Sequence, residues 1–364
     1  MRTGNVLICP LEWGLGHTAR MIPIAASLRE RGFTVIAAGG EAARNLFSAE
    51  LKDTGFIDFP GFQPRYSKIL PAWLAMICRI PSFIYHSCRE HRQLKKIIRD
   101  NDINIVISDN RFGLWNRDVT SLYVTHQLRI PFPRPFRFAE GAGILLHRLI
   151  IRRYDFCFIP DLPGDMNLSG RLSHGIKLPR NTIYSGILSR FSLVSSEKMN
   201  LPEGRCTVVL SGPEPQRGIL KEKIISHFSG SETPVIILGG RPGSGEGESR
   251  AGNITIYDHL AGPFMKAALE GSSSVISRSG YTSIMELVSL GCTALLIPTP
   301  GQTEQEYLAE YLSSKGWFRT ISQGEIDSIV CEKAEVQFSS REFIMESEKL
   351  LNAALDKLSE YKKA

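Results

Sequence analysis

Short apolar runs recur along this chain and alternate with stretches long enough to form helices. The runs are rich in Val, Ile and Leu and do not alternate with polar residues, which is typical of strands buried on both faces of a parallel sheet. They fall into two series: Val6–Cys9, Phe33–Ala38, Ile103–Ser108, Leu122–Thr125 and Phe156–Ile159, then Cys206–Leu210, Val235–Leu238, Ile254–Tyr257, Val275–Ser277 and Ala294–Ile297. The pattern predicts an α/β protein with two Rossmann-like domains.

The length of the chain also favours two domains. It has 364 residues, and single hydrophobic cores usually stop growing near about 250 to 300 residues. Serines and a proline interrupt the pattern between the two series, and an apolar stripe of helical period appears near the end. We therefore expect an N-terminal domain at 1–190, a linker at 191–202, a C-terminal domain at 203–338 and a final helix at 339–364.

Composition excludes several classes of protein. Hydrophobic residues make up 43% and charged residues 22%, so a largely disordered or collagen-like chain is excluded. The seven cysteines show no CxxC spacing and come without a recognisable secretory signal, which favours a reduced, cytoplasmic protein. The apolar run Ile69–Cys78 is too short for the roughly 20 residues that span a bilayer, so no transmembrane helix is expected.

Basic charge is concentrated in the first half of the chain. Residues 1–190 carry 26 Lys and Arg against 15 Asp and Glu, a net of +11, so with a total of +6 the remainder carries −5. Such asymmetry indicates that one half faces an anionic partner, either a nucleic acid or a membrane surface. A merely solvated basic face is the alternative.

Two segments, Arg65–Arg99 and Arg129–Arg153, hold most of this surplus, and apolar side chains lie among their basic residues. The apolar side chains are Trp73, Leu74, Met76, Ile77, Phe83, Ile84 and Tyr85, then Phe132, Phe136, Phe138, Ile144, Leu145, Leu146, Ile150 and Ile151. The mixture favours a peripheral contact with an anionic membrane over nucleic-acid binding, for which no recognisable module is present. Alternatively, these side chains pack into the N-terminal core.

Parallel sheets bind ligands beyond the carboxyl ends of their strands, so the loops there are the candidate sites. In the first loop, Gly14 and Gly16 permit close approach of a ligand, and His17 at the helix start can accept a proton, with a reference pKa of about 6.5. A histidine that merely caps the helix is the alternative. A dinucleotide site is disfavoured because no acidic residue ends the next strand, which runs into Gly39.

Asp109 follows another predicted strand of the same half. It can orient His17 or remove a proton from an acceptor hydroxyl itself, although a turn-forming aspartate is an alternative. The sequence Asp100-Asn101-Asp102 matches a DxD metal motif, but it precedes its strand and is interpreted as a helix-to-strand turn. We expect no required metal or cofactor.

The second half carries a glycine turn between a strand and a helix. Ser279 and Gly280 would present unpaired backbone N–H groups at the helix start, where the macrodipole favours phosphate. Thr282 and Glu286 share one helix face, and the Glu286 carboxylate can accept two hydrogen bonds from a ribose, although a solvated glutamate is an alternative. A polar loop with Gln302 and Gln305 follows the next strand.

These motifs resemble the family 28, MurG-like glycosyltransferases, which have the GT-B architecture of two Rossmann-like domains facing across a cleft. The similar residues are Ser-Arg-Ser-Gly at 277–280, a glutamate six residues later, a proline-rich strand end and a glutamine-containing loop. More loosely, the 14–17 loop and Thr125-His126-Gln127 resemble the family's acceptor-side motifs, which makes His126 an acceptor-side candidate. The resemblance implies that Glu286 holds the ribose, Gly280 and its neighbours the diphosphate, and Gln305 the donor sugar.

The chain departs from the family pattern in two places. The family's Gly-Ser-Gln-Gly turn is replaced by 211–218, which contains two prolines and Arg217, and Glu306 stands where the family has a second glutamine. Guanidinium groups match phosphate oxygens bidentately, so Arg217 and Arg278 are candidate diphosphate ligands.

Together these observations predict an inverting, metal-independent glycosyltransferase. It would move a sugar from a UDP-sugar, such as UDP-N-acetylglucosamine, to a lipid-linked, glycolipid or other hydrophobic acceptor at the inner face of the cytoplasmic membrane. His17 or Asp109 would act as the base. A UDP-sugar epimerase of the same architecture and a noncatalytic subunit that binds nucleotide-sugars are the alternatives.

Overall fold

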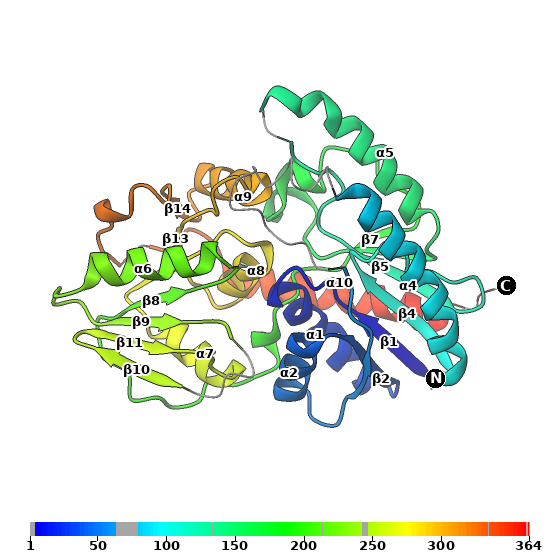
Figure 1. Ribbon diagram of the computed structural model, residues 1–364, viewed down its shortest axis with the longest axis horizontal. Helices are drawn as coiled ribbons and strands as arrows, with labels where there is room; N and C mark the ends of the chain where they lie inside the picture. Colours follow the sequence, from blue (N-terminus) through cyan, green and yellow to red (C-terminus); the bar gives the residue numbers. More distant parts are fainter. Residues whose placement is uncertain are drawn as a thin grey trace. The chain divides into compact units, whose positions relative to one another are not determined.

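The computed structural model describes residues 4–62, 79–132, 134–212, 214–241, 247–333, 335–361 and 363. The chain divides into two compact units. One extends to Leu188 and includes the last helix from Phe343; the other holds Ser189–Glu342 together with Gly14–Gly16. Each unit is built on its own seven-stranded sheet (Figure 1). The predicted α/β class with two Rossmann-like domains is confirmed.

The first sheet is parallel throughout, in the order β3-β2-β1-β4-β5-β6-β7. Its strands are β1 (Asn5–Cys9), β2 (Thr34–Gly39), β3 (Gly55–Asp58), β4 (Ile103–Asp109), β5 (Thr120–Val124), β6 (Phe156–Ile159) and β7 (Thr182–Tyr184). The central strands are buried on both faces, as their continuous apolar sequence predicts. The strand order reverses between β1 and β4, so their carboxyl ends form the switch point where ligands bind in such sheets.

Five α-helices of the described residues belong to the first unit (Figure 1). They are α1 (Leu15–Glu30), α2 (Glu41–Glu50), α4 (Ile80–Asp100), α5 (Glu140–Ile151) and, from the end of the chain, α10 (Ser340–Glu360); short 3-10 turns are η1 (Arg134–Ala139), η2 (Gly164–Met166) and η3 (Gly170–Leu172). The predicted turn at Asp100–Asp102 is confirmed: α4 ends there, β4 begins at Ile103, and Asp102 has a φ of +49°.

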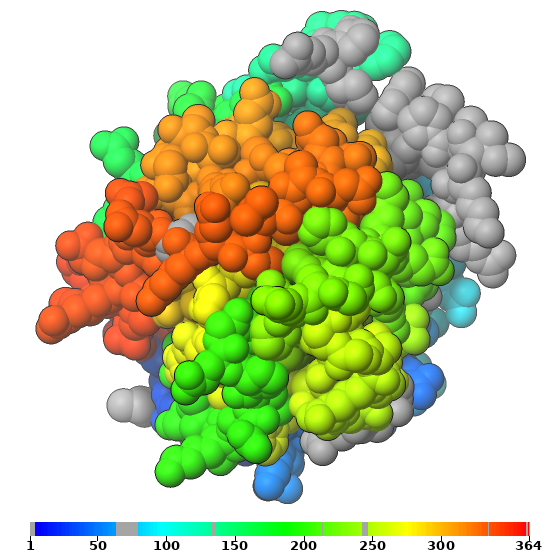
Figure 2. All heavy atoms as spheres, turned by 90° about the vertical axis from the view of Figure 1, so that its left-hand side faces the viewer, coloured from blue at the N-terminus to red at the C-terminus, as the bar shows by residue number. Residues whose placement is uncertain are grey.

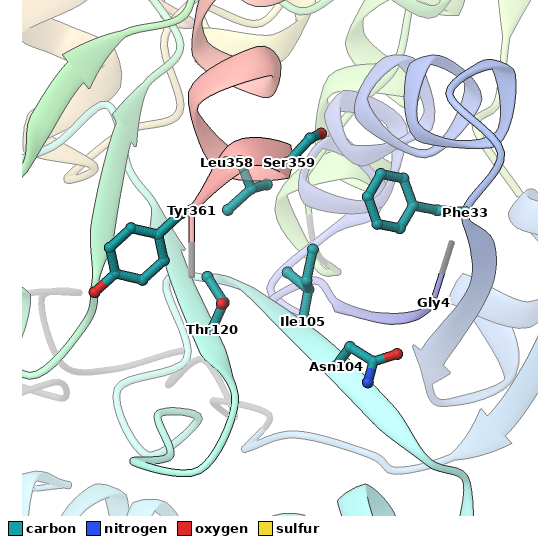
Figure 3. A pocket seen from close by; sticks show the side chains of 8 residues that line it. All are labelled: Gly4, Phe33, Asn104, Ile105, Thr120, Leu358, Ser359 and Tyr361. Carbon is teal, nitrogen blue, oxygen red and sulfur yellow. The ribbon is translucent and has the colours of Figure 1, made fainter. Parts of the chain in front are cut away.

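Helix α10, predicted from its apolar stripe, packs its end on the amino edge of the first sheet. Lys363 Nζ donates to the carbonyls of Asn116 and Val119, both at 2.8 Å. Figure 3 shows the small cavity left there, with Leu358 and Tyr361 on the helix side. Its volume is about 40 Å³, which suits a few water molecules but no nucleotide.

The second sheet has the order β10-β11-β9-β8-β12-β13-β14 and is parallel except for β10, which is antiparallel to β11. Its strands are β8 (Cys206–Val209), β9 (Val235–Leu238), β10 (Glu248–Ala251), β11 (Ile254–Tyr257), β12 (Ser274–Ser277), β13 (Leu295–Leu296) and β14 (Arg319–Thr320). Figure 2 looks onto this unit, coloured green to orange. Here the order reverses between β8 and β12, which defines the switch point of this unit.

The helices of the second unit follow the βα pattern predicted from the sequence. They are α6 (Gln216–Phe228), α7 (Gly262–Glu270), α8 (Tyr281–Ser289) and α9 (Thr303–Ser314), with the short turns η4 (Arg190–Ser192) and η5 (Ile326–Ser328). The segment 191–202, expected to be a linker, instead belongs to this unit. Lys266 Nζ donates to the carbonyls of Phe191 at 3.0 Å and Val194 at 2.9 Å, which ties the segment to α7.

Candidate functional site

At the switch point of the first sheet, a histidine and an aspartate meet. His17 lies in the first turn of α1, directly after β1, and Asp109 is the last residue of β4. His17 Nδ1 lies 3.0 Å from Asp109 Oδ2, and the two side chains are 20% and 0% exposed. The structure thus brings together both predicted catalytic residues, in the arrangement expected if Asp109 orients the imidazole.

Arg20 joins this pair, one helical turn after His17. Its Nε donates to Asp109 Oδ2 at 2.7 Å, and its Nη2 donates to Oδ1. Its Nη1 lies 2.9 Å from His126 Nδ1, so the predicted acceptor-side histidine belongs to the same cluster. Arg20 is 1% and His126 4% exposed. We call His17, Arg20, Asp109 and His126 the histidine cluster.

The charges of the histidine cluster set the protonation of its members. Burial is the largest influence on the pKa of His17 and lowers it; Asp109 raises it, while Arg20 and His126 lower it further, so the pKa lies below the usual 6.5. Burial would raise the pKa of Asp109, but Arg20 and His17 outweigh burial and bring it to about 2. Near neutral pH the cluster therefore holds a carboxylate and an uncharged imidazole that can accept a proton.

The loop before His17 depends on glycine for its backbone path. Gly14 has a φ of +135°, in the region that side chains rarely adopt. Gly16 precedes His17 within the first turn of α1 and has ordinary dihedral angles. Of the two predicted acceptor-side glycines, Gly14 is thus required by conformation.

At the switch point of the second sheet, β12 leads into a glycine turn and α8. Gly280 is the N-cap residue of α8, and among the described residues no side chain caps this helix. Ser279 is fully buried, and its Oγ donates to the carbonyl of Gln305 at 2.8 Å, which fixes the turn. The first N–H groups of α8 and the positive end of its dipole make this turn suited to an anion.

A Cβ atom at Gly280 would meet only Ser283 Oγ, at 4.0 Å. Gly280 itself has a φ of −70° and a ψ of 137°. These angles suit any residue, so the fold itself does not require glycine here. What glycine provides is a turn surface without a side chain, over which a ligand can approach the backbone.

The predicted ribose ligand, Glu286, is buried and ionically paired. It lies on the second turn of α8 and is 7% exposed, and Thr282, one turn earlier, is 8% exposed. Arg190 Nε donates to Glu286 Oε1 at 2.9 Å. The arginine compensates the negative charge of this carboxylate, since a buried charge without a partner is costly.

Side-chain amides organise the loop after β13. Gln305 Oε1 accepts a hydrogen bond from the Thr299 backbone at 2.9 Å, and its Nε2 donates to Gln302 Oε1 at 2.6 Å. Glu306 Oε1 accepts from the backbone N–H of Gly301 at 2.9 Å. Because Ser279 donates to the Gln305 carbonyl, the structure brings both predicted glutamines next to the glycine turn.

Arg278, predicted to face a diphosphate, requires a correction. It is fully buried, and its Nη1 donates to the carbonyls of Ile297 and Pro298, both at 3.2 Å. Its Nη2 donates to the Gln216 carbonyl at 2.9 Å and to Gln323 Oε1 at 2.6 Å. The guanidinium therefore joins loops of the second unit through these hydrogen bonds instead of directing its Nη donors at a ligand.

The other predicted arginine, Arg217, lies in the first turn of α6, after β8. Its Nε and Nη2 donate to Glu214 Oε1 at 3.0 and 2.9 Å, and its Nη1 donates to the Gly240 carbonyl at 3.3 Å. It is thus at the second switch point, but its charge is partly compensated by Glu214. Pro213 of the same turn lies outside the described residues.

In the ranges that the structure describes, no three His, Cys, Asp or Glu side chains are grouped as a metal ion would require. No helix within those ranges has both the length and the apolar character to cross a bilayer. The apolar residues predicted at 73–77 lie outside the described part of the chain.

Sequence reasoning missed the two arginines that complete these sites. Arg20 follows His17 by three residues, a spacing that places both on one helix face, so the pattern held a usable signal. Arg190 is distant in sequence from Glu286, and no local pattern connects them. A second His–Asp pair, His174 Nε2 with Asp161 Oδ2 at 3.0 Å, was also not predicted.

Comparison with known proteins supports this description. Residues 262–360 match the Glycosyltransferase family 28 C-terminal domain. Over 85% of its length, the chain is 25% identical to an uncharacterized glycosyltransferase of Methanosarcina acetivorans, and the match covers 81% of that protein. The chain is also 22% identical to a protein of Corynebacterium diphtheriae, and the match covers 86% of this chain and 82% of the relative. That relative is the UDP-N-acetylglucosamine--N-acetylmuramyl-(pentapeptide) pyrophosphoryl-undecaprenol N-acetylglucosamine transferase.

Solved structures share the fold at low sequence identity. The glycotransferase of kitacinnamycin aligns with a TM-score of 0.67 at 14% identity, covering 98% of this chain and 99% of its own. The spinosyn rhamnosyltransferase SpnG complexed with thymidine diphosphate aligns with a TM-score of 0.59 at 13% identity. The alignment covers 98% of this chain and 95% of that protein.

These matches and the two parallel sheets define the class of protein: the chain is a glycosyltransferase of the GT-B fold. Within that class, residues 262–360 match the family 28 C-terminal domain. The resemblance predicted from the sequence is confirmed.

Proposed function

We propose that this glycosyltransferase is an inverting, metal-independent enzyme that transfers a sugar from a UDP-sugar, such as UDP-N-acetylglucosamine, to a lipid-linked or other hydrophobic acceptor. The transfer takes place at the cytoplasmic face of the membrane. The observation that carries the proposal is the partly buried His17–Asp109 pair at the first switch point, with Nδ1 and Oδ2 3.0 Å apart.

The first unit supplies the base. His17, oriented by Asp109, accepts the proton of the acceptor hydroxyl as the hydroxyl oxygen attacks the anomeric carbon and the bond to the UDP leaving group breaks. The lowered pKa of His17 favours the uncharged imidazole that this step requires. General base catalysis of this kind contributes about 100- to 10,000-fold to the rate.

The second unit binds the donor. The side-chain-free turn at Gly280 and the positive end of α8 suit the diphosphate, whose negative charge grows as the sugar departs. Glu286, paired with Arg190, accepts hydrogen bonds from the ribose. Gln305, joined to Ser279 and Gln302, contacts the donor sugar. The relative from Corynebacterium diphtheriae, named for a UDP-N-acetylglucosamine donor, supports the choice of UDP.

A surface of the first unit suits a lipid acceptor. The exposed apolar side chains include Leu145, Leu146 and Leu149 of α5, which are 58%, 50% and 51% exposed. At the end of α5 lies a groove of about 670 Å³ that is lined by four cationic side chains: Arg148, Arg152, Lys177 and Arg180. Exposed leucines beside cations are typical of a peripheral contact with an anionic membrane, where each nearby cation contributes about 1 kcal/mol.

A donor screen tests the proposal. The purified chain is titrated with UDP-, GDP-, ADP- and dTDP-sugars by calorimetry, with and without a chelator, and the tightest donor is assayed with lipid-linked acceptors in anionic vesicles. We expect UDP-sugars to bind most tightly, the chelator to have no effect and sugar to appear on the lipid. Release of an epimer from the donor alone would support an epimerase instead, and binding without turnover would support a noncatalytic subunit.

A further inference from the structure

Arg20 is the buried cation of the histidine cluster. Its side chain is 1% exposed and lies against Asp109, which is 0% exposed. Arg20 Nε donates to Asp109 Oδ2 at 2.7 Å and Nη2 donates to Oδ1, so the guanidinium is hydrogen-bonded to both carboxylate oxygens. Two buried charges are tolerated only when they are paired in this manner.

Both imidazoles of the cluster contact the same guanidinium. Arg20 Nη2 lies 2.8 Å from His17 Nδ1, and Nη1 lies 2.9 Å from His126 Nδ1. We propose that Arg20 is the positioning residue of this site: it locks the Asp109 carboxylate that orients His17 and ties both imidazoles to one ion pair. Its role in turnover rests on the proposed role of His17 as the base.

The second His–Asp pair of the same unit shows what Arg20 adds. His174 Nε2 lies 3.0 Å from Asp161 Oδ2, the same separation as in the histidine cluster. Asp161 is held by neutral donors: the backbone N–H groups of Leu168 at 2.8 Å and Ser169 at 3.0 Å, and the Ser169 hydroxyl at 2.6 Å. A carboxylate can thus be fixed beside an imidazole without a cation. At Asp109 the chain uses a guanidinium instead, which also places a positive charge next to both histidines.

That positive charge acts against protonation of His17. The charged and titratable groups that face its imidazole are Asp109 from β4, Arg20 from α1 and His126 after β5. Asp109 favours the imidazolium, whereas burial, Arg20 and His126 disfavour it, and their sum lowers the pKa of His17. Because Arg20 offsets part of the attraction of Asp109, the pair stays a carboxylate with a neutral base.

Titration of the histidines by NMR tests this role without any substrate. The full chain is labelled with ¹⁵N-histidine, and the His17 and His126 signals are assigned from the His17→Gln and His126→Gln variants. In Arg20→Met we expect the midpoint of His17 to rise by about one pH unit, since a neighbouring cation has been removed while Asp109 remains. Arg20→Lys restores a cation without the planar guanidinium group. Its His17 midpoint should therefore lie close to that of the unsubstituted chain.

Turnover gives a second reading of the same change. The acid limb of kcat/KM in Arg20→Met should move to higher pH, so that the variant loses up to about sixfold more activity at pH 6 than at pH 8 relative to the unsubstituted chain. Arg111→Met is the matched control because Arg111 is also buried and paired, with Glu90 at 3.1 Å. It should lower stability without moving the His17 midpoint.

Three outcomes would overturn the assignment. One is a His17 midpoint that is the same in Arg20→Met as in the unsubstituted chain; another is an equal shift in Arg111→Met. If Arg20→Met does not fold, a His17 midpoint at or above about 6.5 in the unsubstituted chain still contradicts the role of Arg20. A shifted midpoint in a protein that transfers no sugar would leave Arg20 as the positioning residue and remove the proposed function instead.

Discussion

At the switch point of the first sheet, ionised side chains carry the site: Asp109 and Arg20 are fully buried and paired, and an imidazole lies against them. At the switch point of the second sheet, Gly280 leaves the turn without a side chain, and Arg278 beside it donates to carbonyls within the unit. Both sites occupy the same position of the same fold. The difference teaches that the fold sets the place of a site, while its side chains set its chemistry: the first suits proton transfer and the second suits an anion.

The largest effect should come from removing the base of the first site. His17→Gln leaves a side chain of similar size that cannot accept a proton, so turnover should fall by about 100- to 10,000-fold. UDP affinity, which is proposed to depend on the second site, should stay unchanged. Steady-state transfer assays and calorimetry with UDP measure the two quantities separately.

His174→Gln is the control for this substitution, because His174 forms an Asp161 pair of the same length, 3.0 Å, and is similarly exposed, 18% against 20%. It should retain turnover. Equal losses of UDP affinity in His17→Gln and in variants of the second site would contradict the separation of the two sites, since donor binding is proposed for the second site alone.

A smaller effect is expected at Glu286, and it concerns UDP affinity instead of turnover. Glu286→Gln keeps the shape of the side chain but removes a charged acceptor, and hydrogen bonds to charged groups contribute about 1.5 to 3 kcal/mol. UDP affinity should therefore fall by about tenfold or more, with kcat at saturating donor reduced much less. Calorimetry with UDP and with inorganic pyrophosphate would show whether the loss of affinity concerns the nucleoside part of UDP.

Arg190→Met separates this loss from destabilisation. Arg190 pairs with Glu286 at 2.9 Å, and breaking a buried pair costs about 3 to 5 kcal/mol of unfolding free energy. Both variants should unfold at lower denaturant concentration, but only Glu286→Gln removes the carboxylate from the ligand. If the two variants lost UDP affinity and stability in equal proportion, Glu286 would be a structural residue.

Sequence patterns predicted the buried parts of the fold and missed the exposed ones. The central strands appear as uninterrupted apolar runs because both of their faces are buried, and they were located to within a residue or two. β3, β7, β10 and β14 were not predicted: β7 has only three residues, none of them fully buried, β10 is exposed along its length, and β14 has only two residues, Arg319 and Thr320. Edge strands carry little of the apolar signal on which such predictions rest.

The candidate sites divide in the same way. The strand-end rule located His17 and Asp109, which the structure joins at 3.0 Å, because the rule depends on topology alone. The direction of a long side chain depends on remote partners. Arg278 was predicted to face a ligand, yet it turns toward Gln216 and Gln323, which lie 62 and 45 residues away along the chain. No pattern near Arg278 indicates those acceptors.

The smallest expected effect tests the feature that most distinguishes the second site, its turn without a side chain. Gly280→Ala should leave the unfolding free energy within about 0.5 kcal/mol, because φ is −70° and the new Cβ would meet only Ser283 Oγ at 4.0 Å. If a diphosphate approaches the turn backbone, the same methyl group should weaken UDP binding by about tenfold, or roughly 1.4 kcal/mol.

Gly316→Ala should give the opposite result and serves as the control. Gly316 has a φ of +71°, so an alanine there is strained by about 1 to 2 kcal/mol, but it follows α9 and is not part of the glycine turn. It should lower the unfolding free energy and leave UDP affinity unchanged. Should Gly280→Ala bind UDP as tightly as the unsubstituted chain, no phosphate approaches this backbone, and the donor half of the proposal fails while the histidine cluster keeps its role.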